Sequence, residues 1–409
     1  MSLKVISLYS GIGGLDFGFE AAGFETLAAL DLDPIACFMV RLNRQWPVIE
    51  GDIAGISSQA ILDTAGIPRG AAEVLIGGPP CQPFSKSGYW VSGDARRLDD
   101  PRAGTLTHYL RVLRDTLPKA FLLENVPGMS YRGKSEGVEA IRNAIAEINA
   151  LEGTHYSFSV ETLNAARYGV PQLRERVFII GARDGRKFRF PSATHSLPCE
   201  AWHNASLTPY RTAWDAIGDL PANPNDEELQ MTGKWAGLLP TIPEGENYLW
   251  HTDRGGGSPL FGWRRRYWSF LLKLSKGLPS WTIQAQPGPA TGPFHWRNRR
   301  LSAMELGRLQ TFPDGIVYDC RRADAQRLIG NAVPSALAEI LAGEMDRQLL
   351  GGKANNSFPT LLPPRREPVP EPEAVARLPS KYAKLIGKHN EHPGTGRGHR
   401  AIERAEAIG

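Results

Sequence analysis

The first half of the chain alternates short apolar runs with segments of helical periodicity, and this alternation limits the fold more than any other feature. Buried strands are expected at residues 5–8, 27–30, 74–76, 121–123, 158–163 and 177–181. Helical apolar spacing covers residues 105–117 and 137–151. Strands that alternate with helices form βαβ crossovers, so the pattern predicts an α/β fold with a doubly wound, mostly parallel sheet.

A Gly-rich turn follows the first expected strand, where residues 9–14 read Tyr-Ser-Gly-Ile-Gly-Gly. Glycines let the backbone approach a nucleotide-like ligand, and an acidic residue after the next strand, here Asp31, can accept ribose hydroxyls. Asp52 follows a further possible strand and can accept from an adenine amino group, although a plain loop aspartate is the simpler interpretation. The turn departs from the GxGxxG spacing, so alone it also fits a nicotinamide site or a structural turn.

The sharpest local signal comes directly after the strand at 74–76, where residues 77–85 read Gly-Gly-Pro-Pro-Cys-Gln-Pro-Phe-Ser. Two prolines restrict the backbone just before Cys81. At the carboxyl end of a parallel strand, this arrangement presents a thiol at the ligand crevice, where a partly ionised sulfur acts as a nucleophile. A buried structural cysteine is the alternative, which the flanking glycines and prolines disfavour.

A glutamate follows the strand at 121–123, so the carboxylate of Glu124 is expected at the same sheet edge as Cys81. A buried carboxyl that stays protonated can donate to a ring nitrogen, and an ionised one can accept from an exocyclic amine. A glutamate in a strand-end salt bridge is the alternative.

Residues 172–176 read Gln-Leu-Arg-Glu-Arg and precede the strand at 177–181. Alternation along an extended chain predicts that Gln172, Arg174 and Arg176 share one face. Such donors can clamp a carbonyl oxygen or a phosphate, whereas ordinary surface arginines are the alternative.

These motifs stand in the order found in the cytosine-5 DNA methyltransferases of the bacterial restriction-modification type, and the chain resembles that family. Residues 9–14 resemble its first motif and residues 78–85 its nucleophile motif. Residues 124–126 resemble its glutamate motif and residues 172–176 its Gln-x-Arg-x-Arg motif. Its ninth and tenth motifs resemble residues 300–313 and 330–334. The departures are small: Tyr9 replaces a frequent phenylalanine, Asp31 a common glutamate and Ser302 a usual threonine. None of them removes a reacting group.

The resemblance implies a Rossmann-like enzyme that transfers a methyl group from S-adenosylmethionine to carbon 5 of a flipped-out cytosine in a specific duplex DNA sequence. It implies covalent attack on carbon 6 by Cys81, with Glu124, Arg174 and Arg176 as the other catalytic residues. The implied cofactor-binding residues are Tyr9, Gly11, Gly13, Gly14, Asp31, Asp52, Ile53, Pro79, Leu106, Asn331 and Val333. No metal site is expected.

The same resemblance implies DNA contacts. A base must leave the duplex to be modified, and the polar stretch 86–102 is the candidate mobile element. The expected DNA-binding residues are Gln82, Ser85, Lys86, Arg97, Arg264, Arg265 and Arg266. The last three belong to a stretch where basic residues, among them Arg254 and Lys273, alternate with aromatic ones. An aromatic core with a solvated basic rim is the alternative there.

A change in residue composition and periodicity divides the chain. From about residue 186, Pro, Gly and aromatic residues replace long periodic segments, and eight of the ten tryptophans fall between Trp202 and Trp296. Helical spacing returns at 302–310 and 323–350, where a late helix can pack back on the first domain. We therefore expect a catalytic and cofactor-binding domain at 1–185, an irregular target-recognition domain at 186–295 and a return to the first domain at 296–350.

The remaining residues, 351–409, form a Pro-rich tail. Eight prolines fall in residues 353–409, a composition that does not support an independent core, so the tail is expected to be disordered. A basic arm touching phosphates is the alternative, with five basic residues: Lys381, Lys384, Lys388, Arg397 and Arg400. The tail holds the whole excess of positive charge, because residues 1–352 balance at 37 basic against 37 acidic side chains.

Composition limits the protein class only broadly. No apolar run approaches the roughly 18 residues of a membrane helix, and no secretory leader is evident, so a cytoplasmic protein without a membrane partner is expected. The four cysteines form neither a disulfide framework nor a CxxC site. The expected partner is duplex DNA, with a monomeric enzyme and a separate restriction endonuclease. A tRNA cytosine methyltransferase and a catalytically inactive DNA-binding module are the competing functions.

Overall fold

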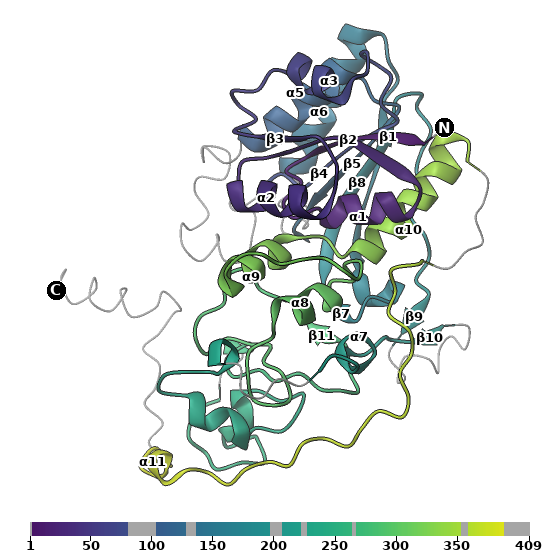
Figure 1. The fold of residues 1–409 in the computed structure, drawn as a ribbon. Helices are drawn as coiled ribbons and strands as arrows, with labels where there is room; N and C mark the ends of the chain where they lie inside the picture. Colours follow the sequence, from purple (N-terminus) through teal and green to yellow (C-terminus); the bar gives the residue numbers. More distant parts are fainter. Residues whose placement is uncertain are drawn as a thin grey trace, which may run out of the picture.

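The computed structural model describes residues 2–80, 104–127, 136–196, 207–221, 227–263, 267–352 and 359–387. Two lobes lie one above the other in Figure 1, an α/β lobe that carries the N-terminus and a lobe of short elements and loops. We call them the catalytic lobe and the recognition lobe. None of the helices in the described ranges is long and apolar enough to cross a lipid bilayer.

A seven-stranded sheet forms the centre of the catalytic lobe. Its strands are β1 (Leu3–Leu8), β2 (Phe24–Asp31), β3 (Val48–Glu50), β4 (Val74–Gly77), β5 (Ala120–Asn125), β6 (Ser157–Asn164) and β8 (Glu175–Ala182). They are ordered β3-β2-β1-β4-β5-β8-β6, and β8 runs antiparallel to both of its neighbours. The predicted doubly wound, mostly parallel sheet is confirmed, with its topological switch between β1 and β4.

Helices cover both faces of this sheet (Figure 1). One apolar core lies under α3 (Ser58–Ala65), α5 (Gly104–Thr116) and α6 (Glu136–Glu152). The other lies under α1 (Gly14–Ala21) and α10 (Ser335–Met345). The predicted parallel strands read as continuous apolar runs because both faces are buried in this way.

The late helical segment does return to the catalytic lobe. It is interrupted at Pro334, however, and forms α9 (Arg322–Asn331) and α10 instead of one helix. The contact of α10 with α1 requires a glycine, because a Cβ on Gly18 would lie 2.4 Å from the Cβ of Ala338. The packing therefore depends on the absence of one side chain.

The recognition lobe contains few regular elements. Its short helices are α7 (Ala213–Ile217), η6 (Glu227–Leu229), η7 (Ala236–Thr241), η8 (Tyr248–His251) and α8 (Ala303–Leu309). Three further helices belong to the catalytic lobe: α2 (Pro34–Asn43) beside the sheet, η4 (Ala165–Tyr168) against its core, and the π-helix Asp346–Leu350, which continues α10. The strands of the recognition lobe form two parallel pairs, β7 (Gln172–Leu173) with β11 (Ser280–Trp281), and β9 (His195–Ser196) with β10 (Thr208–Pro209). An aromatic cluster around Trp235, Tyr248 and Phe270 fills the far end of this lobe.

Residues 359–387, which we call the C-terminal segment, pack along both lobes and end in α11 (Ser380–Ala383) (Figure 1). Glu339 of α10 accepts the backbone N–H of Thr360, and Tyr382 is buried in the aromatic cluster of the recognition lobe. The expectation of disorder is wrong for this part of the tail. The composition excludes an independent core, but the segment is ordered by packing against the surfaces of the two lobes. Residues 388–409, with Lys388, Arg397 and Arg400, lie outside the described ranges.

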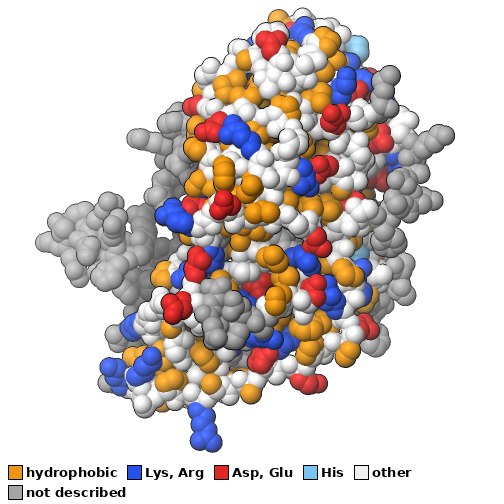
Figure 2. Space-filling view, viewed as in Figure 1, with side chains coloured by type: hydrophobic (Ala, Val, Ile, Leu, Met, Phe, Trp, Pro, Cys, Tyr) orange, Lys and Arg blue, Asp and Glu red, His pale blue; other side chains and the backbone are white. Residues whose placement is uncertain are grey.

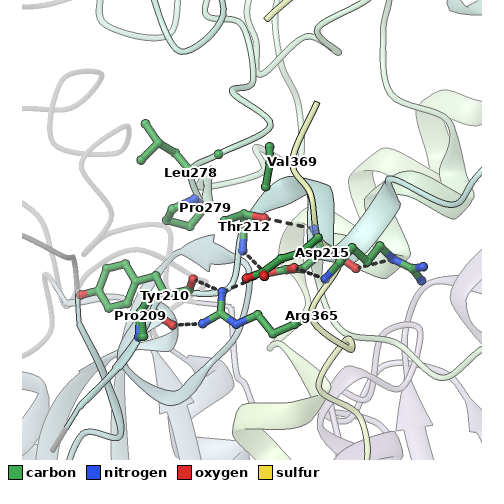
Figure 3. A pocket seen from close by; sticks show the side chains of 11 residues that line it. Pro209, Tyr210, Thr212, Asp215, Leu278, Pro279, Arg365 and Val369 are labelled. Carbon is green, nitrogen blue, oxygen red and sulfur yellow. Dashed lines mark hydrogen bonds and ion pairs between the residues drawn. The ribbon is translucent and has the colours of Figure 1, made fainter. Parts of the chain in front are cut away.

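Arginines fasten the C-terminal segment near α7. Arg365 contacts the carboxylate of Asp215 at 3.1 Å, and the backbone N–H of Arg366 donates to the same carboxylate (Figure 3). A cavity of about 190 Å³ lies beside these contacts, between the segment and the loop around Leu278. Because Asp215 also completes the capping box of Thr212, one buried carboxylate joins the segment to the start of α7.

Candidate active site

The carboxyl ends of β1, β4 and β5 meet at one edge of the sheet, beside the topological switch. Open α/β sheets bind their ligands at this place. The Gly-rich turn leaves β1 here with three residues at positive φ, Tyr9, Gly11 and Gly13. Glycine meets this demand without strain at two of the positions. A Cβ on Gly11 would meet no atom within 4 Å, so the backbone is open to a ligand at that point.

Asp31 lies at the end of β2 and shapes the turn. One carboxylate oxygen accepts the N–H of Gly11 at 2.7 Å, and the other accepts the N–H of Asp33 at 2.8 Å. Burial raises the pKa of Asp31, while these backbone donors act in the opposite direction. Each oxygen retains a second lone pair, so the carboxylate can still accept a ribose hydroxyl.

The tenth-motif residues close the turn from the other side. A Cβ on Gly14 would lie 2.6 Å from the carbonyl oxygen of Val333, which therefore packs directly against the start of α1. Val333 is buried, and Asn331 is exposed at the end of α9. These two expected cofactor residues thus both lie at the α9–α10 junction, one exposed and one buried.

The expected adenine end is built after β3. The side chain of Asp52 is exposed and that of Ile53 is buried, so the two can offer a polar and an apolar contact. Arg111 of α5 holds this turn, because its guanidinium donates to the carbonyl oxygens of Ile53 at 2.8 Å and Ile56 at 3.0 Å. Arg111 was not singled out from the sequence, since its helical position alone carries no such signal.

A network of hydrogen bonds holds the chain that enters Cys81. Asn125 donates to the carbonyl oxygen of Pro79 at 3.3 Å, and Thr105 donates to that of Pro80 at 3.1 Å. The hydroxyl of Tyr9 donates in turn to the carbonyl oxygen of Thr105 at 2.6 Å. The cofactor turn, α5 and β5 therefore converge on this loop. Pro79 is buried, and Leu106 is half-buried on the first turn of α5.

Glu124 is almost completely buried at the end of β5. Its Oε1 lies 2.8 Å from Nε of Arg176. Its Oε2 faces Gly78, where a Cβ would lie only 2.9 Å away. Burial raises the pKa of Glu124, and the nearby Arg176 and Arg174 oppose the rise. The site therefore combines a buried carboxyl, whose pKa burial raises, with a fixed cationic neighbour.

Arg174 binds protein backbone in this structure, whereas the sequence indicated a donor for a ligand. Its guanidinium is fully buried and donates to the carbonyl oxygens of Ile283 and Gly330. Gln172 is also buried and bonds to Gln310. The predicted alternation is present, because Gln172 and Arg174 are buried while Leu173 and Glu175 are more exposed, but the strand changes partners at Arg174, so its donors go to backbone carbonyl oxygens. Arg174 ties the lobes together, and Arg176 alone reaches Glu124.

Several expected residues lie outside the described ranges: Cys81, Gln82, Ser85, Lys86, Arg97, Arg264, Arg265 and Arg266, with the rest of the stretch 86–102. Lys273, one of the basic residues that alternate with aromatic ones in the recognition lobe, is buried and donates to the carbonyl oxygen of Ile242. Basic and acidic side chains are interspersed over both lobes on the face in Figure 2. Charge alone therefore does not mark a nucleic-acid surface on that face.

Comparison with known proteins agrees with this geometry. The family model described as "C-5 cytosine-specific DNA methylase" matches residues 3–347. The type II methyltransferase M.SacI of Streptomyces achromogenes is 40% identical over 372 residues, which cover 85% of this chain and 93% of the relative. The type II methyltransferase M.NgoFVII of Neisseria gonorrhoeae is 36% identical, over 81% of this chain and 83% of the relative.

Among solved structures, the Dnmt2 methyltransferase of S. pombe is similar in fold, with a TM-score of 0.57 and 17% identity over 85% of this chain and 99% of that one. The family match extends through the Gly-rich turn, Glu124 and the α9–α10 junction. The chain is therefore a DNA cytosine-5 methyltransferase that uses S-adenosylmethionine, and it belongs to the C-5 cytosine-specific DNA methylase family.

Proposed function

We propose that this enzyme methylates one cytosine within a specific duplex sequence, as the modification half of a restriction-modification system, and that Cys81, Glu124 and Arg176 carry the chemistry. The observation that carries the catalytic part is the buried Glu124–Arg176 pair beside the loop that enters Cys81. The relatives named type II methyltransferases support the biological part.

Glu124 supplies the proton that the cytosine ring needs. Attack by the Cys81 thiolate on carbon 6 places electron density on the ring, and protonation at the third ring nitrogen stabilises the enamine that forms. The oxygen of Glu124 that faces Gly78 is the one directed toward the Cys81 loop. Burial raises the pKa of this carboxyl, which favours its role as a proton donor.

Arg176 orients that carboxyl and supplies a donor for the cytosine carbonyl oxygen. Its Nε contacts Glu124, while Nη1 donates to the carbonyl oxygen of Glu175 at 2.7 Å. A guanidinium held from two directions loses little conformational freedom when the base enters. Water then accepts the proton from carbon 5, the carbon–sulfur bond breaks to release the Cys81 thiolate, and the third ring nitrogen returns its proton to Glu124, which restores the aromatic ring.

The cofactor fits the Gly-rich side of the same edge. S-adenosylmethionine supplies the methyl group for carbon 5. Asp31 would hold its ribose, Asp52 and Ile53 its adenine, and the backbone around Gly11 its remaining part, with Pro79, Leu106, Asn331 and Val333 lining the sides. The open space at Gly11 and the acceptor capacity of Asp31 support this assignment.

A covalent trap tests the mechanism. Duplex DNA with 5-fluorocytosine at the target should form a stable adduct in the presence of cofactor, because fluorine cannot leave carbon 5 as a proton does. Cys81→Ser should form no adduct and should still bind cofactor. A folded wild-type enzyme that forms no adduct with any cognate duplex would contradict the proposal.

The target and its context need a second experiment. Base-resolution mapping of methylcytosine in DNA from cells that express the protein should mark one cytosine within a recurring sequence. Parallel assays with labelled cofactor should show methyl transfer to duplex DNA and none to tRNA. A monomeric enzyme in the cytoplasm, with a separate cognate endonuclease, remains part of this proposal. Methyl transfer to tRNA alone would overturn the assignment of DNA as substrate.

A further inference from the structure

Two tryptophans of the recognition lobe expose their rings next to each other. Trp268 is 43% exposed and Trp281 is 38% exposed, and their ring centroids lie 5.4 Å apart in an edge-to-face arrangement. We call them the tryptophan pair. Among the tryptophans that the structure describes, only Trp263 is exposed to a similar degree. Trp296, by contrast, is buried among apolar side chains.

The outward direction of Trp281 follows from its strand. Ser280 and Ile283, on either side of the Trp281–Thr282 dipeptide, are buried, whereas Trp281 and Thr282 are exposed. Trp281 pairs with Leu173 of β7, and the hydroxyl of Thr282 donates to the carbonyl oxygen of Leu173 at 2.6 Å. The indole ring is therefore anchored by a rigid backbone and directed away from the core.

The tryptophan pair adjoins the active site through β7. The strands β7 and β11 lie next to α8 in the recognition lobe (Figure 1), and β7 leads directly into β8 of the catalytic sheet. From Leu173 the chain reaches Arg176 within three residues, at most about 10 Å of extended backbone. Arg176 contacts Glu124, so β11 lies within reach of DNA that delivers a base to Glu124.

We propose that the tryptophan pair is a DNA contact, on which the sugar or base next to the target cytosine stacks. This inference rests on the proposed function. Every base has an aromatic face, so such a contact holds the DNA strand without reading its sequence. It also removes from water two apolar ring surfaces that the protein leaves uncovered.

Binding measurements test the tryptophan pair directly. The probe is a short unmethylated duplex centred on the cytosine that methylcytosine mapping marks, with 2-aminopurine as its neighbour. Trp281→Ala and Trp268→Ala should each weaken binding about tenfold, the order of a lost base–aromatic stack. Both should leave the dependence of affinity on salt unchanged, because no phosphate contact is lost. Wild type should quench the 2-aminopurine more strongly than either variant.

Two controls separate this contact from a folding defect. Trp281→Phe should retain most of the affinity because it keeps an aromatic face. Leu151→Ala removes an apolar side chain that is even more exposed, at 73%, at the end of α6, and should bind as wild type. All variants should bind cofactor normally.

Unchanged affinity and unchanged quenching in both alanine variants would overturn the tryptophan pair as a DNA contact. Equal weakening by Trp281→Phe and Trp281→Ala would also overturn it, because an aromatic face would then be irrelevant. Either result leaves the proposed function intact if wild type still forms the 5-fluorocytosine adduct. If wild type forms no adduct, the proposed function itself fails, whatever the variants bind.

Discussion

The two lobes are built in different ways. In the catalytic lobe, seven hydrogen-bonded strands fix the backbone, and apolar side chains on both faces of the sheet hold the helices against it. In the recognition lobe, individual side-chain contacts hold much of the backbone in place. Lys276, for example, forms a buried ion pair with Glu244 at 2.5 Å, and Thr241 bonds to His251 at 2.7 Å.

This difference suits the catalytic lobe to a fixed chemical reaction and the recognition lobe to variable DNA recognition. A sheet edge holds Glu124 and the cofactor turn in positions that many surrounding residues determine together. A lobe held by separate contacts can change its surface by exchanging a few side chains. The C-terminal segment serves the second lobe most, because Lys276 also bonds to the carbonyl oxygen of Glu371 and Tyr382 enters the aromatic cluster.

The largest expected effect lies at the sheet edge. Glu124→Gln keeps the shape of the side chain and removes its proton, so methylation should slow by about 100- to 10,000-fold. Single-turnover rates with duplex DNA measure this change. Glu161→Gln is the matched control, because Glu161 is exposed on β6 and pairs with the same residue, Phe178, that Glu124 pairs with from β5. A similar loss in both variants would show that the effect is structural.

The pH dependence of the methylation rate also distinguishes a catalytic role of Glu124 from a structural one. Because burial raises the pKa of Glu124, the protonated, active form persists above the ordinary range of a glutamate. The wild-type rate should therefore decline as the pH rises through this elevated pKa. Glu124→Gln should lack that declining limb in its residual activity. A decline of the same shape in the variant would assign it to another group.

The next effect belongs to the recognition lobe. Tyr382 packs parallel to Trp235 and donates to the carbonyl oxygen of Lys234, so Tyr382→Ala should cost about 3 kcal/mol of stability. Hydrogen exchange should show faster opening around the aromatic cluster, with unchanged protection in the central sheet. Tyr382→Phe loses only the hydrogen bond, about 1 kcal/mol. Uniform loss of protection in both lobes would contradict their separate construction.

The sequence predicts the catalytic lobe better than it predicts the contacts between distant segments. Continuous apolar strands and the motifs at their ends predict the sheet, the cofactor turn and the shared edge of Glu124 and the Cys81 loop. The long-range contacts were not predictable: Arg174 bonds to residues more than one hundred positions away, and the C-terminal segment is ordered only by the lobes it crosses. Periodicity reports local structure and a common face, whereas these contacts depend on how distant segments meet.

A smaller effect tests the close packing of the catalytic lobe. Gly18→Ala places a methyl group 2.4 Å from both the carbonyl oxygen of Ser335 and the Cβ of Ala338, so α1 and α10 must separate, at about 1–3 kcal/mol. Thermal unfolding measures this loss. Gly343→Ala on the same α10 meets no atom within 4 Å and should be neutral or stabilising, because alanine favours helix. Equal stability of the two variants would show that the lobe absorbs overpacking.

The smallest effect concerns Arg111, which links α5 to the turn that carries Asp52 and Ile53. Arg111→Met keeps the length of the stem and removes the donors to the carbonyl oxygens of Ile53 and Ile56. The KM for S-adenosylmethionine should rise about tenfold, equivalent to about 1.4 kcal/mol, while kcat at saturating cofactor and the affinity for DNA stay unchanged. Arg114→Met, on the exposed side of the same helix, should leave all three values unchanged. A loss of kcat with an unchanged KM would instead place Arg111 in the support of the Cys81 loop, through the Thr105 end of α5. The catalytic lobe would then transmit changes between its two ends through one helix, and the contrast with the contact-by-contact recognition lobe would be sharper.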